Sequence, residues 1–185
     1  MMVRYRGGDY TLGEGYTRGR IRPRTVDIVS IGKGDVAPEF ELPDQDGKPT
    51  RLSELLTAGP VVMFFYPAAL SSGCTAEACN FRDLAGEFRE AGVQRVGVSR
   101  DTVEKQKKFA EVNGFDYPLL SDPESKVAAA YGVKRRLPLG PLSTKRLTFV
   151  IGTDGVVIDV IHSELDMNQH ADRALEAVTK ARPAS

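Results

Sequence analysis

An uninterrupted apolar run at residues 61–66 is the feature that most limits how this chain can fold. The run reads Val-Val-Met-Phe-Phe-Tyr, which is far too short to cross a membrane as a helix. It shows no alternation of apolar and polar residues, so it predicts a strand that is buried on both faces. Residues 93–98, preceded by Gly92, predict a second buried strand. Strands of this kind need helices on both sides of their sheet, which indicates an α/β fold.

The rest of the chain alternates between helix and strand patterns. Apolar spacing and capping residues predict helices at 75–90, 102–113, 123–131 and 167–181. Further strands are expected at 40–42, 117–120, 147–151 and 156–161. Turn residues predict hairpins at Asp44–Gly47 and Thr153–Gly155. This order predicts an α/β sandwich with a mixed central β-sheet flanked by helices.

Several predicted helices have residues at their ends that are typical of helix starts and stops. Ser53 is expected to cap a short helix that ends before Gly59. Asp101 or Thr102 is expected to cap a helix that carries Phe109 and Val112 and stops at Gly114. Proline is tolerated in a first helical turn, so the helix at 123–131 is expected to begin at its proline.

The chain divides into two parts of different composition. Residues 1–30 hold six arginines and several glycines with little apolar periodicity, so we expect a flexible N-terminal extension. A tail that packs on the domain, a basic docking arm and an incorrectly assigned start codon stay open as alternatives. Residues 31–185 are expected to form one domain with its own core, since 41% of the chain is hydrophobic.

Charge and cysteine content limit the function classes. The 25 basic and 25 acidic side chains cancel, so there is no overall field to attract nucleic acid or an anionic membrane. The N-terminus lacks the apolar segment of a secretion signal, so a cytoplasmic location is expected. Two cysteines are too few for a disulfide scaffold, and a reducing compartment would not keep a structural bridge oxidised.

The two cysteines, Cys74 and Cys79, lie where an apolar strand gives way to a helix. Active sites of open α/β sheets gather at this end of the strands. We expect Cys74 in the first helical turn, where free N–H groups and the helix dipole favour a thiolate. A thiolate that attacks a peroxide becomes a sulfenic acid, which condenses with a second thiol. Cys79 is the second thiol.

Three alternative roles for the pair are less favourable. Two inert buried cysteines are possible, but inertness does not account for a position at a helix start. A metal site would need more ligands, and only His162 and His170 could help; we expect no metal and no cofactor. A thioredoxin-type reductase would need a Cys-x-x-Cys spacing, which is absent.

The spacing of the pair has a structural consequence. In an intact helix, residues five apart are about 140° apart around the axis and their Cα atoms are roughly 8.6 Å apart. A disulfide needs Cα atoms within ~7 Å of each other. We therefore expect the start of the helix to unwind when Cys74 and Cys79 form a disulfide.

At this motif the sequence resembles the peroxiredoxins, specifically the peroxiredoxin Q or bacterioferritin comigratory protein group. The family pattern Pro-x3-Thr/Ser-x2-Cys is matched by Pro67, Ser71 and Cys74, and Cys79 matches members with a resolving cysteine five positions on. Four other segments agree: GDVAPEFELPDQDGKP, EACNFRDL, YPLLSDPESKVAAAYGV and KRLTFVIGTDGVV. The resemblance covers residues of about 34–180.

The resemblance implies a thioredoxin-like fold and a peroxidase that reduces hydrogen peroxide and organic hydroperoxides with electrons from thioredoxin. It implies that Cys74 is peroxidatic and Cys79 resolving. Pro67 would shield the thiolate, and Ser71 would bond the thiolate and the peroxide. Arg146 would favour the thiolate and donate to the peroxide oxygens. The family group is often monomeric, so we expect a monomer or a weak dimer.

Two points stay open in the sequence. Glu77 could orient Arg146, or it could be the N3 residue of a capping box. Ser71 stands where threonine is commoner and Ser72 where many members have proline, so the loop before Cys74 could be less rigid. A different class of function, a redox sensor or binding module switched by the Cys74–Cys79 disulfide, is the alternative to a peroxidase.

Overall fold

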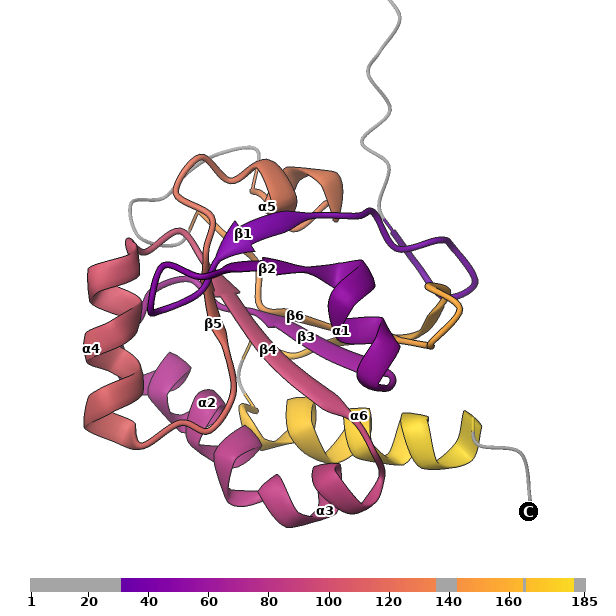
Figure 1. Ribbon diagram of the computed structural model, residues 1–185. Coiled ribbons are helices and arrows are strands. Elements are labelled where there is room, and N and C mark those ends of the chain that lie inside the picture. Colours follow the sequence, from indigo (N-terminus) through magenta and orange to yellow (C-terminus); the bar gives the residue numbers. More distant parts are fainter. Residues whose placement is uncertain (1–30, 136–142, 165, 182–185) are drawn as a thin grey trace, which may run out of the picture.

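The computed structural model describes residues 31–135, 143–164 and 166–181 (Figure 1). The prediction for residues 1–30 lies outside these ranges. The described strands are β1 (Glu41–Pro43), β2 (Pro49–Arg51), β3 (Val61–Phe65), β4 (Gln94–Ser99), β5 (Leu119–Ser121), β6 (Leu147–Ile151) and β7 (Val157–His162). The described helices are α1 (Leu52–Ala58), α2 (Ser72–Asp83), α3 (Ala85–Glu90), α4 (Val103–Asn113), α5 (Lys126–Ala130) and α6 (Asn168–Ala181).

The main sheet has five strands in the order β5-β4-β3-β6-β7. The strands β3, β4 and β5 are parallel to one another, while β6 is antiparallel to β3 and β7 antiparallel to β6. Every residue of β3 is buried, as its apolar sequence predicts for the central strand. The predicted mixed sheet is therefore confirmed. The carboxyl ends of β3 and β4 lie side by side and face the start of α2.

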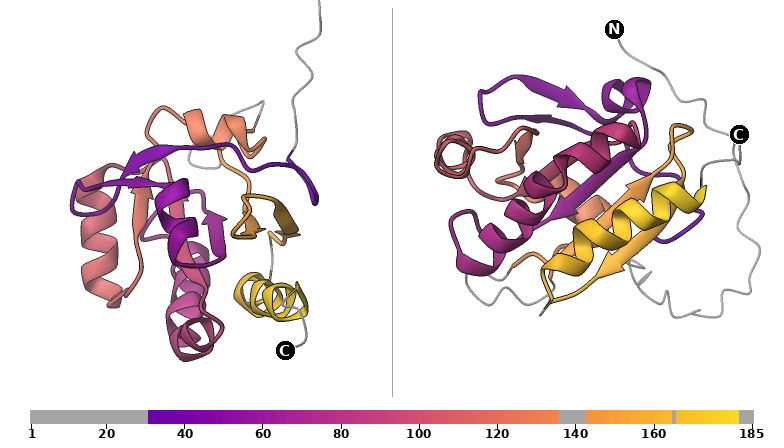
Figure 2. Two further views of the ribbon diagram at one scale, coloured as in Figure 1. Left: turned by 45° about the vertical axis from the view of Figure 1, so that its right-hand side comes forward. Right: turned by 90° about the horizontal axis from the view of Figure 1, so that it is seen from below.

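Two hydrophobic clusters cover the two faces of this sheet. Alternate residues of β3 point to opposite faces: Val62 and Phe64 pack with α2, α3, α4 and α6, whereas Val61 and Met63 pack with α1 and α5. Figure 1 shows α2, α3 and α6 along the lower side of the sheet, and the β1–β2 hairpin with α5 along the upper side. The second view of Figure 2 shows α2 and α6 lying side by side, as their contacts require.

Most element predictions hold, with differences at helix ends. The predicted helix 75–90 is two helices, because the backbone of Leu84 leaves helical geometry between α2 and α3. The helix predicted from residue 123 begins at Lys126, because Ser125 just before it has a left-handed backbone. Asp122 accepts hydrogen bonds from the backbone N–H groups of Lys126 and Ala128 and so takes the capping role.

One side-chain prediction in the helices is wrong, and one apolar side chain departs from its helical pattern. Ser53 lies inside α1, whose N-cap residue is Arg51, and its hydroxyl contacts Glu39 instead. Val112 is exposed, because the side of α4 that faces the sheet carries Phe109 and Ala110. The other end predictions for α4 are correct: Thr102 caps its start, and Gly114 ends it in the left-handed conformation.

No helix within the described residues is long and apolar enough to span a membrane.

Candidate active site

Cys74 lies at the start of α2, directly beyond the carboxyl end of β3. The chain leaves β3 through the buried Pro67 and enters α2 at Ser72, so Cys74 lies in the first helical turn, as predicted, and α2 begins three residues before the predicted helix 75–90. Its side chain is 1% exposed. The first N–H groups of a helix have no partners within the helix, so the backbone around Cys74 offers positive partial charge to a thiolate.

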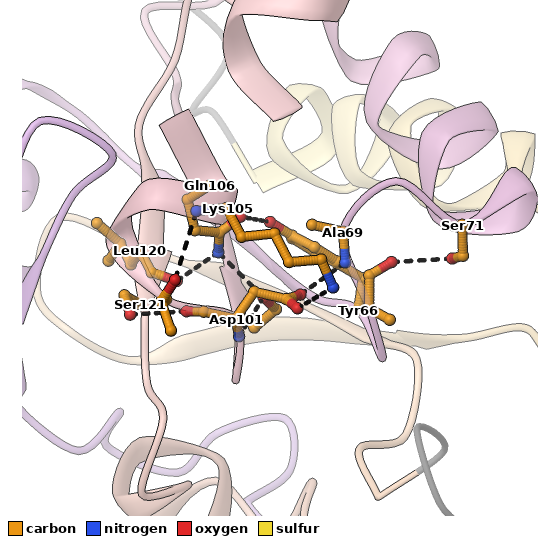
Figure 3. Close-up of polar contacts among 11 residues, drawn as sticks. Tyr66, Ala69, Ser71, Asp101, Lys105, Gln106, Leu120 and Ser121 are labelled. Atoms are coloured by element: carbon orange, nitrogen blue, oxygen red, sulfur yellow. Dashed lines mark hydrogen bonds and ion pairs between the residues drawn. The ribbon is translucent and has the colours of Figure 1, made fainter. Parts of the chain in front are cut away.

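A polar network ties the loop before Cys74 to the neighbouring turn of the sheet. Asp101 follows β4, and its Oδ2 accepts hydrogen bonds from the Ala69 N–H at 2.6 Å and from the Ser99 hydroxyl at 2.8 Å. Its Oδ1 pairs with Lys105 Nζ at 2.5 Å. Figure 3 shows the Asp101 carboxylate joined by dashed lines to the nitrogens of Lys105 and Ala69. The turn that leads into Cys74 is thereby fixed to the β4–α4 turn.

A second part of this network lies deeper, under the same loop. The Tyr66 hydroxyl donates to Gln106 Oε1 at 2.5 Å, and the Gln106 amide donates to Leu120 O at 2.9 Å and to Ser99 Oγ at 3.0 Å (Figure 3). Burial raises the pKa of Tyr66 well above its ordinary value, so the phenol stays a neutral donor. Buried polar groups that all find partners give a rigid support for the residues above them.

Arg146 reaches the thiol from the start of β6. Arg146 as a whole residue is 6% exposed, and its Nη2 lies 3.3 Å from Cys74 Sγ. The other terminal nitrogen, Nη1, donates to Glu77 Oε2. Burial works against the charged form of Arg146, but the nearby Glu77 and Cys74 raise its pKa above the ordinary value. A permanent positive charge at this distance favours the thiolate form of a cysteine.

Glu77 settles one of the open alternatives. It lies one turn after Cys74 in α2 and is completely buried against Arg146. The N-cap of α2 is Ser71, so Glu77 is too far along the helix to be the N3 residue of a capping box. Burial raises the pKa of Glu77 to about 8, although Arg146 acts in the opposite direction. Glu77 therefore orients Arg146.

Ser71 is close in sequence to the thiol but its hydroxyl is directed elsewhere. The side chain is exposed, and Oγ donates to the carbonyl of Ala68 at 2.9 Å (Figure 3). A bond from Ser71 to Cys74 is not among the hydrogen bonds of the described residues. The structure thus brings Cys74, Glu77 and Arg146 together. The hydroxyl of Ser71 is bonded to the loop backbone at Ala68 instead.

Cys79 lies in the same unbroken helix as Cys74. Both cysteines are free thiols, and Cys79 is half-buried with its Sγ 3.9 Å from Asn113 Oδ1 of α4. Because the two cysteines are five residues apart in one continuous helix, the helix would have to unwind locally before they could form a disulfide.

The two histidines differ in surroundings. His170 of α6 is completely buried, with Nδ1 2.8 Å from Thr148 Oγ1 and 3.6 Å from Glu77 Oε1. His162 is exposed and lies 3.6 Å from Glu164. Among the described residues, no group of three potential metal ligands comes together.

Sequence reasoning missed two supports of this site. The sequence marks Asp101 only as a possible helix cap and His170 only as a possible metal ligand. A signal for Asp101 is present, since it follows the carboxyl end of a strand parallel to β3. The contact of His170 with Glu77 depends on how α6 packs against α2, which no local pattern shows.

Comparisons with known proteins agree with this geometry. The model of the AhpC/TSA family matches residues 33–160. A Mycobacterium tuberculosis protein whose name places it among the peroxiredoxins is 60% identical over 149 residues, which are 80% of this chain and 97% of that protein.

Solved structures give the same result. The crystal structure of peroxidoxin BcpB from Mycobacterium tuberculosis is 58% identical, with a TM-score of 0.79, covering 83% of this chain and 99% of that one. A bacterioferritin comigratory protein from Xanthomonas campestris is 30% identical, with a TM-score of 0.70, covering 76% of this chain and 90% of that one. The expected thioredoxin-like fold is confirmed by these neighbours. The chain belongs to the AhpC/TSA family and, within it, to the peroxiredoxins.

Proposed function

We propose that this peroxiredoxin reduces hydrogen peroxide and organic hydroperoxides through Cys74, resolves the product with Cys79 and is reduced again by thioredoxin. The observation that carries the proposal is the 3.3 Å approach of Arg146 Nη2 to Cys74 Sγ at the start of a helix. A guanidinium and free helix N–H groups together favour the thiolate, which is the nucleophile in peroxide reduction.

In the first step, the Cys74 thiolate attacks the terminal oxygen of the peroxide. The S–O bond forms as the O–O bond breaks, and the leaving oxygen takes a proton to become water or an alcohol. Sulfur is oxidised and the peroxide reduced by two electrons. Arg146 stabilises the charge that develops on the oxygens. In this proposal Pro67 shields the thiolate, and the Ser71 hydroxyl turns from Ala68 to bond the bound peroxide.

In the second step, Cys79 attacks the Cys74 sulfenic acid and displaces water, which leaves a disulfide. Thioredoxin then returns two electrons by thiol–disulfide exchange. The neighbour from Xanthomonas campestris supports the choice of substrate, since that protein is described by its alkyl peroxide reduction activity. We also propose a cytoplasmic protein that acts as a monomer or weak dimer, because the mechanism needs reduced thiols and only one chain.

The experiment compares wild type, Cys74→Ser and Cys79→Ser in two assays. Stopped-flow mixing with peroxide measures the first oxidation, and a thioredoxin-coupled assay measures turnover. Cys74→Ser should abolish both, because the nucleophile is lost. Cys79→Ser should keep the first oxidation and lose turnover, and the half-buried position of Cys79 makes it a mild substitution.

Full peroxide consumption by Cys74→Ser would contradict the proposal. A second-order rate for the wild type no faster than that of free cysteine at the same pH would instead favour the disulfide-switched sensor. The observation that favours testing this second function is that Cys74 and Cys79 lie in one continuous helix, since a disulfide between them would require that helix to unwind locally.

A further inference from the structure

The loop that precedes Cys74 is attached to the sheet by one polar contact. Residues 67–71 lead from β3 into α2, and two of their hydrogen bonds, both to Ala68 O, stay within the loop. The Ala69 N–H instead donates to Asp101 Oδ2 at 2.6 Å (Figure 3). Among the hydrogen bonds of the described residues, no other joins this loop to a part of the chain outside α2. This bond is called the Ala69–Asp101 tether below.

The carboxylate that accepts the tether is itself held in place. Asp101 Oδ2 also accepts from the Ser99 hydroxyl at 2.8 Å, and the backbone N–H of Asp101 donates to that hydroxyl at 3.1 Å. Its Oδ1 pairs with Lys105 Nζ at 2.5 Å, and only 11% of the Asp101 side chain is exposed. A hydrogen bond to an ionised acceptor is stronger than one between neutral groups. The Ala69–Asp101 tether therefore stabilises the closed loop more than an ordinary backbone bond would.

The later part of α2 is held more firmly than its start. Ala78 is completely buried, and its carbonyl accepts a hydrogen bond from the Tyr117 hydroxyl at 2.7 Å. One turn on, Arg82 Nη1 donates to the carbonyl of Asn113 at 2.6 Å. In an intact helix the Cα atoms of the two cysteines are roughly 8.6 Å apart, and a disulfide needs them within ~7 Å. The first turn of α2 and the loop attached to it must therefore make this approach.

The tether opposes that movement. Ala69 and Cys74 are five residues apart, so unwinding of the first turn displaces the peptide whose N–H is bonded to Asp101. The bond thus belongs to the dithiol form and is lost in the disulfide form, where water can take its place. A contact that is present in only one of two states shifts the equilibrium between them toward that state.

We propose that Asp101 is a positioning residue that sets the balance between the dithiol and the disulfide of Cys74 and Cys79. Its bond to Ala69 keeps the loop closed in the dithiol form, in which Arg146 contacts the Cys74 thiol. The tether breaks when the disulfide forms, so it favours the form that meets peroxide. The proposal rests on the Cys74–Cys79 disulfide of the function proposed above.

The test measures the dithiol–disulfide equilibrium of the full chain in glutathione buffers of set composition. Two glutathione thiols reduce the protein disulfide and leave as one glutathione disulfide, so two electrons are exchanged. Alkylation followed by mass spectrometry gives the fraction of each form. Asp101→Ala removes the tether, and we expect the disulfide to become about tenfold more stable relative to the dithiol. This change equals a reduction potential about 30 mV lower.

Unfolding temperatures give a second readout for the same variant. Asp101→Ala should lower the unfolding temperature of the reduced protein by a few degrees more than that of the oxidised protein, in which the tether is already broken. A residue that only supported the fold would lower both temperatures equally, and that result would contradict the proposal.

Asp122→Ala is the matched control. The buried carboxylate of Asp122 accepts from the backbone N–H groups of Lys126 and Ala128 at 2.9 Å each, so the same kind of bond is lost. These bonds belong to the start of α5 and not to the active-site loop, so the dithiol–disulfide equilibrium should keep its wild-type value. An equal shift in Asp122→Ala, or no shift in Asp101→Ala, would overturn the proposal.

Asp101→Asn covers the case in which Asp101→Ala does not fold. It keeps the size of the side chain and one acceptor oxygen but loses the charge, so its shift should have the same direction and a smaller size. If only this variant folds, an unchanged equilibrium in it overturns the proposal.

Peroxide consumption by the wild type is measured separately. A wild type whose equilibrium depends on Asp101 as described but which ignores peroxide would refute the proposed function and leave the role of Asp101 standing. Rapid peroxide reduction with no shift in the variants would refute the role of Asp101 alone. A wild type that forms no Cys74–Cys79 disulfide at any glutathione ratio would refute both.

Discussion

At the scale of single residues, reactivity depends on how the charges around one buried sulfur are shared. Cys74 and Glu77 both contact Arg146, and neither contact involves water-exposed atoms to any extent. In such a site the electrostatic interaction between charges is strong, because little water screens it. Lysine would keep the charge of Arg146 but could not reach two anions with separate nitrogens in one plane.

Ser71 offers the clearest residue-scale prediction for the reaction itself. Its hydroxyl bonds Ala68 in the resting protein, so it must rotate to serve a bound peroxide. Ser71→Ala should slow the second-order reaction with peroxide by about tenfold, the effect expected for one hydrogen bond to a charged group. Stopped-flow fluorescence or thiol loss gives the rate.

Ser71→Thr is the control, since it retains the hydroxyl and should react at a rate close to that of the wild type. The side chain of Ser71 is exposed, so both variants should unfold at nearly the wild-type temperature. Equal peroxide rates for Ser71→Ala and the wild type would remove Ser71 from the mechanism.

At the scale of elements, the start of α2 must be both rigid and able to open. The Asp101 network holds the preceding loop, whereas the N-cap Ser71 makes no side-chain capping bond. Leu70, just before the helix, has a left-handed backbone with φ of 67°, which costs a bulky residue roughly 1–2 kcal/mol. The first turn of α2 therefore begins at a strained and uncapped point, which favours local unwinding.

Hydrogen exchange tests this expectation directly. Formation of the Cys74–Cys79 disulfide should unwind the start of α2, so amides of residues 72–80 should exchange faster in the oxidised protein. Amides of β3, which are paired on both sides, should be unchanged. Cys79→Ser treated with peroxide is the control, because it oxidises without closing the disulfide. Equal protection of α2 in both redox forms would refute the unwinding step.

At the scale of the whole molecule, the site draws on segments far apart in the chain. The loop before α2, the β4–α4 turn, the start of β6 and the buried side of α6 all contribute side chains. The central position of β3 brings them together, since β4 and β6 flank it in the sheet.

Residues 1–30 provide a whole-molecule prediction. Residues from 31 onward supply two hydrophobic clusters that cover both faces of the sheet, so we expect a chain that starts at residue 31 to fold and keep its peroxide reactivity. Thermal unfolding and the stopped-flow assay, each compared with the full chain, test this. A fall in the unfolding temperature of several degrees would show instead that the extension packs on the domain.

Much of the fold could be predicted because its signals are local. The all-apolar β3, the glycine that ends α4 and the hairpin turns are each encoded within a few residues. Errors occurred where a distant contact or an unusual backbone decides the outcome. Ser125 in a left-handed conformation delays α5, and the direction in which α4 faces the sheet leaves Val112 exposed.

The sequence by itself identified the two cysteines as the candidate reactive pair, their place after a buried strand, and the arginine before the last two strands as a candidate site residue. These follow from spacing and from a family motif, both of which are properties of the linear chain. Only the tertiary structure decided that Glu77 orients Arg146 and that His170 lies against Glu77. The first contact joins residues that are 69 positions apart in the chain, and the second joins residues that are 93 positions apart. They exist because α2 and α6 pack side by side on the face of the sheet that contains β6, and buried charges interact through space rather than along the chain.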